Sequence, residues 1–446
     1  MKSASAQVTI TLLENNITGA GQPDVNVNAA AGTFSLPLLG GNIDFKSTNP
    51  TEFYTTQTAG SGTLPLGVTH VRISSGQGLT LLGTIQPEQV VSIQPKTLYA
   101  GGLNLGTGTY NINYRLAIAG TAWVAGTYYT PTDITLTTPR AQSITINVPS
   151  FMTINTPAPT TILTVASLSN YRTGSGISGT NTFNYSTSLP TLVSLQADGT
   201  STFSFSTTTP KIVDPTPASN LLSAAISSPV TSAAINVTNV AQQLNATGIA
   251  VPVTNRQSVG TTFSVSPANL KANFVQAGTY NLPIRYNLAK TAAAYSSGTI
   301  TATTTSNVQV VVPRLLELLV QTNDIVFNVN SINAYKNGLT VAMPNPVVLS
   351  STVPYSLSVR ASGDFTLSAG NTIPVGAVTI EGAAGQTGVT SLPLTNTLQT
   401  IISGASPQID RSINLQYRIP EAASNALIGK SSGTYQNTIT FTLTAP

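Results

Sequence analysis

The chain has 446 residues, of which only 7% are charged, far below the quarter that is usual in globular proteins. Its 18 basic and 14 acidic residues give a net charge of +4 without any basic cluster, so we expect no nucleic-acid binding. It contains no cysteine, which excludes disulfides and thiol chemistry, and no apolar run approaches the roughly 18 residues of a membrane-spanning helix. Apolar residues that alternate with Thr, Ser and Asn favour an all-β chain, and at about 150 residues per domain the length suggests three domains.

The N-terminus resembles the start of an exported protein. Residues 4–6, Ala-Ser-Ala, match the small-residue pattern that ends a secretory signal, although no apolar stretch precedes them. We favour a mature start near Gln7 after removal of a signal, and the alternative is a chance match in a chain rich in Ser and Ala. Residues 7–13 then predict a strand with Val8, Ile10 and Leu12 on one face.

A short motif recurs three times along the chain. We interpret each copy as a strand, a loop of roughly a dozen residues and a second strand. The first strands of the three copies follow Gly108-Thr109-Tyr110, follow Gly278-Thr279-Tyr280 and begin at Ile413. The second strands follow Gly126-Thr127-Tyr128, Gly298-Thr299 and Gly433-Thr434-Tyr435. Three copies predict three related domains.

Two Val-Pro steps mark the joints between these domains. Val148-Pro149 and Val312-Pro313 each close an alternating strand, and proline ends a strand because it has no amide hydrogen for the ladder. The predicted domains are therefore 1–149, 150–312 and 313–446. Joints this short suit a rod, whereas long Gly/Ser linkers would let the domains tumble independently.

The second and third domains repeat one another in further detail. Residues 168–174 match 332–338, a strand end followed by a Tyr-basic-x-Gly turn, and three more segments match in the same order. No 33–50-residue period of a solenoid or propeller is present. The repeat has the size of a whole sandwich, so we predict three tandem immunoglobulin-like (pilin-like) β-sandwich domains.

The sequence offers no catalytic constellation. His70 is the one histidine, and it lies in an ordinary strand pattern without a Gly-x-Ser-x-Gly elbow, so a structural role is favoured. The carboxylates are scattered singly and form no calcium loop, and one histidine cannot furnish a zinc site. Two distant carboxylates could still meet in the fold, but we expect no enzyme, no cofactor and no metal. Trp123, the one tryptophan, offers little for a sugar-stacking platform.

The segment Gly433 to Leu443 resembles the last strand of bacterial secreted pilin-like β-sandwiches, including the spore-coat-protein-U type. In those families a Gly-x-Tyr turn precedes an alternating C-terminal strand. This chain has Asn437 where they have Asp, and it lacks their cysteines. The resemblance implies an immunoglobulin-like sandwich, export to the bacterial cell surface and assembly through exchanged strands.

A sandwich exposes edge strands whose free N–H and C=O groups pair with a strand from a neighbour. The candidate donor is the strand at residues 7–13, through Val8, Ile10 and Leu12, and the candidate acceptor region is Ile439, Phe441 and Leu443. The third domain has no Val-Pro joint after this region, so we expect it to lack one strand. Residues 151–154 and 315–320 occupy the corresponding places before domains two and three, so the N-terminal run is alternatively the first strand of its own domain. The strand that the third domain is expected to lack favours donation.

Two functions fit these features. The first is a structural subunit of an extracellular bacterial filament or surface layer, a homo-polymer assembled head-to-tail by strand donation. The alternative is a cell-surface adhesin or carbohydrate-binding protein that does not polymerise and binds a surface glycan. Both place the protein outside the cell.

Overall fold

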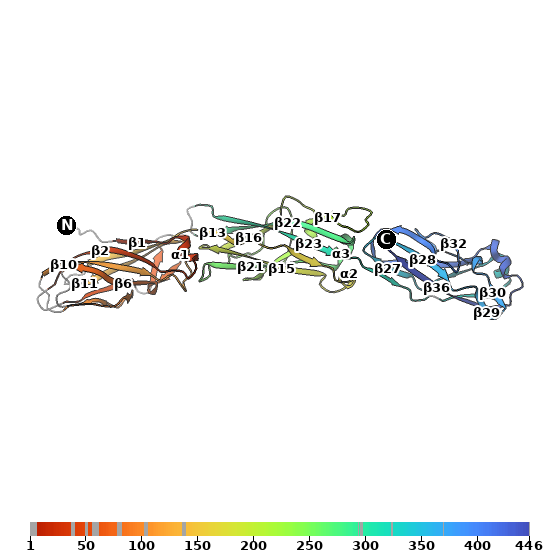
Figure 1. Ribbon diagram of the computed structural model, residues 1–446, viewed down its shortest axis with the longest axis horizontal. Coiled ribbons are helices and arrows are strands. Elements are labelled where there is room, and N and C mark those ends of the chain that lie inside the picture. The colour runs from red at the N-terminus through yellow and green to blue at the C-terminus, as the bar shows by residue number, and fades with distance from the viewer. Residues whose placement is uncertain are drawn as a thin grey trace.

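A computed structural model describes residues 7–36, 41–49, 52–55, 62–77, 83–101, 106–135, 140–292, 294, 298–322, 324–368 and 370–445. The chain forms an elongated rod, with its N-terminal part at one end and its C-terminal part at the other (Figure 1). Three separate hydrophobic clusters lie along the rod, and each is covered by β-sheets. The all-β sandwich class predicted from the sequence is confirmed. We call the three parts the N-terminal, middle and C-terminal sandwiches.

The N-terminal sandwich packs an eight-stranded sheet against a four-stranded sheet. The larger sheet has the order β1 (Gln7–Thr11), β12 (Arg140–Val148), β11 (Gly126–Thr135), β3 (Ile43–Ser47), β9 (Lys96–Ala100), β7 (Thr84–Ile85), with β4 (Glu52–Thr55) on β11 and β5 (Thr63–Pro65) on β4. The smaller sheet has the order β2 (Val25–Leu36), β10 (Gly106–Leu116), β6 (Thr69–Gln77), β8 (Gln89–Val90). The short helices are α1 (Glu14–Thr18) and η1 (Leu66–Val68).

The middle sandwich has a five-stranded and a six-stranded sheet. The first has the order β13 (Met152–Thr156), β15 (Ile177–Thr187), β21 (Arg256–Val265), β18 (Ser223–Ser228), β19 (Ile235–Asn236). The second has the order β14 (Thr161–Thr164), β23 (Thr301–Val312), β22 (Gly278–Lys290), β16 (Thr191–Ala197), β20 (Gln242–Gln243), with β17 (Ser204–Ser206) also on β22. The helices are α2 (Ser169–Arg172), η2 (Ser219–Leu221) and α3 (Pro267–Asn273).

The C-terminal sandwich is built from three sheets. One has the order β30 (Asn371–Ile373), β29 (Phe365–Ser368), β36 (Gly433–Thr444), β28 (Tyr355–Ala361), β33 (Gln399–Ala405), with β25 (Asp324–Val329) also on β36. The others are β24 (Leu316–Leu319), β27 (Val347–Ser351), β34 (Gln408–Ile413) and β26 (Leu339–Ala342), β35 (Leu415–Ile419), β31 (Thr379–Gly382), β32 (Leu392–Pro393). The helices are α4 (Ile332–Asn337), η3 (Val375–Ala377) and η4 (Glu421–Leu427).

The Gly-Thr-Tyr strands β11, β22 and β36 are equivalent in the three sandwiches. In each, the tyrosine ring is buried and its hydroxyl donates a hydrogen bond to the carbonyl four residues earlier. The distances are 2.8 Å from Tyr128 to Val124, 2.9 Å from Tyr280 to Gln276 and 2.9 Å from Tyr435 to Ser431. The glycine that precedes the Thr-Tyr residues of each strand has positive φ, for example +152° at Gly278.

This equivalence corrects the frame of the repeat expected from the sequence. We matched Gly278 to Gly108, but Gly108 lies in β10, which belongs to the opposite sheet of its sandwich. The structural counterparts of Gly278 are Gly126 and Gly433. The three-residue motif occurs twice in the N-terminal sandwich, on strands of different sheets, and alternation alone does not distinguish them.

Candidate functional site

The middle sandwich shows how a Gly-Thr-Tyr strand is paired when both of its edges are covered. Strand β23 runs antiparallel to β22 from the pair Gly278–Val312 to the pair Ala289–Thr301. Strands β16 and β17 cover the other edge. With both neighbours in place, the core-facing side chains of the second half of β22 are fully buried, with 0% exposure for Ile284, Tyr286 and Leu288.

In the C-terminal sandwich the corresponding strand is covered on one edge over only half of its length. Strand β25 pairs with β36 from Gly433 to Thr438. Beyond Thr438, β28 pairs with one edge of β36, and no strand formed by the described residues pairs with the other edge. Half of β36 therefore has an open edge.

The open half of β36 contains the three residues predicted as the acceptor region. Counting from the glycine that begins each strand, Ile439, Phe441 and Leu443 correspond to Ile284, Tyr286 and Leu288. Ile439 remains fully buried, Phe441 is 9% exposed and Leu443 is half-buried. Burial therefore falls along the open half of β36, whereas it is complete in the middle sandwich. Acceptance of a strand at this edge stays a prediction.

Apolar side chains are also exposed on the two strands next to this edge. Strand β24 lies near β36, although it belongs to another sheet. Its Leu316 and Leu319 are 42% and 47% exposed, and Val326 of β25 is 38% exposed. Exposed apolar side chains are therefore present on one strand that pairs with β36 and on one that lies near it.

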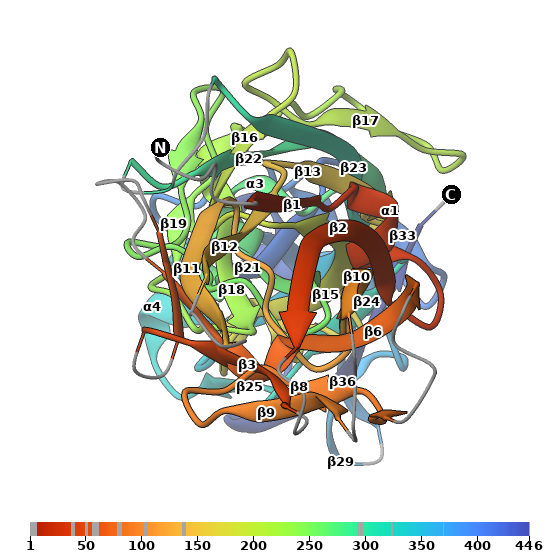
Figure 2. The same ribbon diagram turned by 90° about the vertical axis from the view of Figure 1, so that its left-hand side faces the viewer.

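The candidate donor strand lies within its own sandwich. Strand β1 pairs in parallel with β12, from Gln7 beside Ser143 to Thr11 beside Asn147 (Figure 2). The side chains of Val8, Ile10 and Leu12 have 6%, 0% and 1% exposure and belong to the N-terminal hydrophobic cluster.

From the sequence we aligned residues 7–13 with residues 151–154 and 315–320. In the structure β1 instead corresponds to β14 of the middle sandwich. Strand β14 pairs in parallel with β23, from Thr161 beside Val308 to Thr164 beside Val311. Each short strand is followed by a helical turn, α1 or α2. The sequence identified the strand and its inward face, but alternation carries no information about the pairing partner.

Asn255 was missed by the sequence reasoning. It lies at the joint between the N-terminal and middle sandwiches, is fully buried and has φ of +54°. Its side-chain amide donates hydrogen bonds to the carbonyls of Trp123 and Thr187, each at 2.8 Å, and its oxygen accepts one from the Trp123 N–H at 3.0 Å. The sequence signal for this conformation is an Asn after Pro-x-Thr, since Asn tolerates the left-handed region of φ/ψ space in a turn. Trp123 therefore packs in the joint between these two sandwiches.

His70 shows no catalytic arrangement. Its Nδ1 lies 3.6 Å from Glu88, which is also bound by Arg115. Burial and the charge of Arg115 lower the pKa of His70. In the part of the chain that the structure describes, no group of three or more His, Asp and Glu side chains could hold a metal ion, and no helix could span a membrane.

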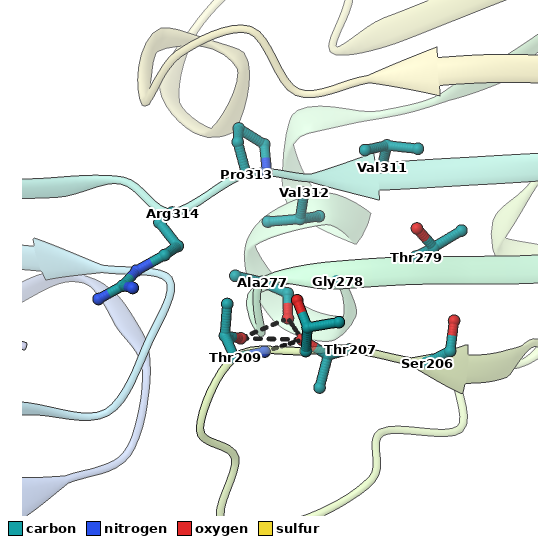
Figure 3. Close-up of a pocket in the computed structure, with 11 residues that line it drawn as sticks. Ser206, Thr207, Thr209, Ala277, Gly278, Thr279, Val311, Val312, Pro313 and Arg314 are labelled. Atoms are coloured by element: carbon teal, nitrogen blue, oxygen red, sulfur yellow. Dashed lines mark hydrogen bonds between the residues drawn. The ribbon is translucent and has the colours of Figure 1, made fainter. Parts of the chain in front are cut away.

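A hollow of about 450 Å³ lies at the joint between the middle and C-terminal sandwiches (Figure 3). The hydroxyls of Thr207 and Thr209 donate to the carbonyl of Ala277 at 2.8 and 3.3 Å, beside the start of β22. No carboxylate or imidazole is among the described residues that line the hollow. It therefore offers no acid–base pair, and we interpret it as packing space at the joint.

No protein-family model and no curated protein matches the chain. Among solved structures it is similar to CfaE, the adhesive subunit of the CFA/I fimbria of enterotoxigenic Escherichia coli, with 12% identity and a TM-score of 0.30 over 69% of this chain and 98% of that chain. It is also similar to the CsuC–CsuE chaperone–tip subunit complex of archaic Csu pili of Acinetobacter baumannii, with 12% identity and a TM-score of 0.29 over 66% and 99%. The CupB6 tip adhesin of Pseudomonas aeruginosa matches with 8% identity and a TM-score of 0.25 over 65% and 98%. Similarity at this level carries no argument about function, which has to be inferred from the geometry of this chain.

Proposed function

We propose that the protein is a subunit of an extracellular bacterial surface filament and that its C-terminal sandwich receives a β-strand from a neighbouring subunit. The observation that carries this proposal is the unequal pairing of β22 and β36. An added strand would satisfy the open N–H and C=O groups after Thr438 and cover Phe441 and Leu443. The proposal keeps the division into domains 1–149, 150–312 and 313–446, and among the described residues of the last domain one edge of β36 is paired over only half of its length.

The middle sandwich indicates what such a strand looks like. Beside the first half of β22, strand β23 buries Val308, Val310 and Val312, with at most 2% exposure. In the C-terminal sandwich β25 fills that half with its own buried residues. Beside the second half, β23 turns the small side chains of Thr304 and Ser306 inward, with 6% and 8% exposure. We therefore expect the incoming strand to carry small residues opposite the open half and to run antiparallel to β36.

The position of β1 favours a subunit that accepts a strand without donating one. Withdrawing β1 would expose Val8, Ile10 and Leu12, and full burial of such side chains is worth roughly 1.5–3 kcal/mol each. A chain of this kind sits at the end of a filament, with its N-terminal and middle sandwiches available to a surface ligand such as a glycan. This is the adhesin function.

The second candidate is the head-to-tail homo-polymer in which residues 7–13 enter the next copy. One observation favours it: among the described strands β1 pairs only with β12 and does so in parallel, a slightly weaker pairing per residue than antiparallel. In this function Val8, Ile10 and Leu12 lie in the acceptor region of a neighbour, against Ile439, Phe441 and Leu443.

Two labelled peptides test the proposal on the full-length protein. One has the sequence of residues 301–312, of which 301–306 pair with the second half of β22 and are expected to pair with the open half of β36, and its control is a scrambled peptide of the same composition. Fluorescence anisotropy should show binding of the first peptide only, and Phe441→Asp should weaken it because a charge would enter an apolar site. Equal binding of both peptides, or of neither, would refute strand acceptance.

The second peptide, residues 7–13, distinguishes the two candidates. Binding of this peptide, together with filaments of the purified protein that disappear when residues 1–13 are deleted, supports the homo-polymer. Deletion that instead lowers the stability of the N-terminal sandwich, in a protein that is monomeric before and after, supports the adhesin. Velocity sedimentation and electron microscopy separate these results.

A further inference from the structure

An equivalent backbone hydrogen bond crosses each of the two joints of the rod. In each, the residue before the Gly-Thr-Tyr strand donates its N–H to a carbonyl of the next sandwich. Ala125 donates to Ser188 at 2.8 Å, and Ala277 donates to Thr352 at 2.6 Å. The acceptor residue is also equivalent, because each hydroxyl donates to the proline at its joint: Ser188 to Pro149 at 2.7 Å and Thr352 to Pro313 at 2.8 Å.

Charged groups strengthen the second joint. Arg172, at the end of α2, donates to the carboxylate of Asp410 at 2.8 Å and to that of Glu317 at 3.2 Å. Lys271 of α3 donates to the other oxygen of Asp410 at 2.7 Å. In a chain with so few charges, four of them meet across this one joint. Opposite charges held between two sandwiches fix their relative orientation.

Apolar packing completes the second joint. Ile409 of β34 belongs to the C-terminal sandwich, yet it packs in the hydrophobic cluster of the middle sandwich and is 4% exposed. Leu168, just before α2, belongs to the same cluster and is 9% exposed. The end of the middle sandwich that carries α2 and α3 is thus covered by its neighbour.

The C-terminal sandwich repeats this end, but nothing in the described part of the chain covers it. The hydroxyl of Tyr171 ties α2 to the carbonyl of Phe274 at 3.0 Å, and that of Tyr335 ties α4 to the carbonyl of Lys430 at 3.1 Å. The residue after each tyrosine is basic, Arg172 or Lys336. The end of the C-terminal sandwich that carries α4 is the far end of the rod, where β36 begins and β29 and β30 are found (Figure 1).

Exposure shows the difference between the covered and the uncovered end. Ile332 corresponds to Leu168, but it is 72% exposed instead of 9%, and Ile428 nearby is 70% exposed. Lys336 is exposed and forms no ion pair with any described residue. Ser432, the counterpart of Ala277, is exposed as well. An isolated exposed apolar side chain would mean little, but Ile332 occupies a position that is buried at a joint of the same chain, and Ile428 adds apolar surface beside it.

We propose that this far end is a docking surface for the next β-sandwich subunit of the filament. The partner brings a carboxylate to Lys336, a backbone carbonyl to the N–H of Ser432 and an apolar side chain to Ile332 and Ile428, as the C-terminal sandwich does for the middle one. The surface rests on the proposed function, since the partner is the subunit whose strand enters beside β36.

The direction of the added strand agrees with this location. Strand β23 runs antiparallel to β22 and leaves the middle sandwich at Val312, at the covered end, where Pro313 begins the next sandwich. A strand that runs antiparallel to the open half of β36 also heads towards the far end, but β25 occupies the edge from Thr438 to Gly433, so the chain passes beside β25 before it reaches that end. The body of the subunit that supplies it is therefore placed against Lys336 and Ser432.

Carbodiimide cross-linking of sheared surface filaments tests the docking surface, because it joins a lysine amine to a carboxylate that is already in contact. The Lys271–Asp410 pair serves as an internal control. We expect an additional amide between Lys336 or Lys430 and an Asp or Glu of a different β-sandwich subunit, identified by mass spectrometry. If the control link forms and neither lysine is linked to another subunit, the proposal is wrong; a link to a second copy of this chain also overturns the choice of partner.

A charge reversal gives a second readout. Lys336→Glu should lower the amount of protein retained on filaments about tenfold, because like charges would meet at the interface. The matched control is Lys211→Glu, an exposed lysine of the middle sandwich that pairs locally with Asp214 and should leave retention unchanged. Unchanged retention of Lys336→Glu refutes the surface. Binding of the 301–312 peptide should be the same in both variants, so loss of peptide binding marks a failure of strand acceptance instead.

Discussion

Asn255 ties the N-terminal and middle sandwiches together, and Asn255→Ala should loosen this joint. The substitution removes two donated hydrogen bonds and one accepted hydrogen bond. It leaves the backbone N–H of Trp123 and two carbonyls without these partners in a buried site. It also places alanine at φ of +54°, a region that Asn tolerates better.

The magnitude can be worked out from these losses. A lost neutral hydrogen bond costs about 0.5–1.5 kcal/mol, and a buried donor left without a partner costs about 1–3 kcal/mol. The left-handed backbone adds about 1 kcal/mol for a residue with a β-carbon. Allowing for relaxation, we expect a loss of about 3–5 kcal/mol in the free energy of unfolding of this part of the rod. With a urea slope of about 2 kcal/mol per molar, the midpoint falls by about 2 M.

Trp123 reports on this joint directly, because it is the one tryptophan of the sequence and is fully buried. Urea unfolding followed by its fluorescence should show an earlier transition in Asn255→Ala, with a red-shifted emission. Asn239→Ala, on an exposed loop of the middle sandwich, is the control and should match the wild type. If the midpoint of Asn255→Ala also matches the wild type, the hydrogen bonds do not hold the joint.

Three further predictions concern the pairing and the charges. Burial raises the pKa of Asp410, but hydrogen bonds from Lys271 and Arg172 outweigh this effect and lower the pKa below its usual 3.8. The contribution of Asp410 to stability is therefore complete above about pH 4 and is lost as the pH falls through the lowered pKa. Asp410→Asn should flatten this acid dependence of the urea midpoint. Ile10→Ala should cost about 2–5 kcal/mol in a purified monomer because the side chain is buried in its own sandwich, and an unchanged melting temperature would contradict pairing within the chain. Gly278→Ala should destabilise the middle sandwich by about 1–3 kcal/mol or more, since its β-carbon would lie 2.6 Å from a phenyl ring of β17; soluble protein of wild-type stability would show that β17 yields freely.

Much of the fold can be predicted from local patterns. The alternation of Ile439, Phe441 and Leu443 predicts both a strand and its inward face, because a β-strand has a period of two. The Val-Pro steps at Pro149 and Pro313 mark strand ends for an equally local reason. These inferences depend on a few neighbouring residues and hold in the structure as strand bounds.

The remaining features depend on contacts between distant residues. The partner of β1 is more than a hundred residues away, and nothing in the alternation of Val8 and Ile10 specifies it. The same holds for Asn255, whose hydrogen-bond partners belong partly to the preceding sandwich. The frame of the repeat was misplaced because Gly108 and Gly126 share one motif on different sheets. The sequence thus indicated which residues face inward but not what they meet.

The passage of the chain from β23 into the next sandwich has a mechanical consequence. A pull along the rod reaches the middle sandwich through Val312, along the axis of a strand that pairs with β22 as far back as Ala289. Such a load shears the ladder, so its hydrogen bonds resist together instead of opening one by one. A strand added beside β36 would load the C-terminal sandwich in the same geometry. An attachment made without any covalent bond would then resist tension in the same way as the continuous chain, and its lifetime under force would be set by the rate at which a whole ladder slips.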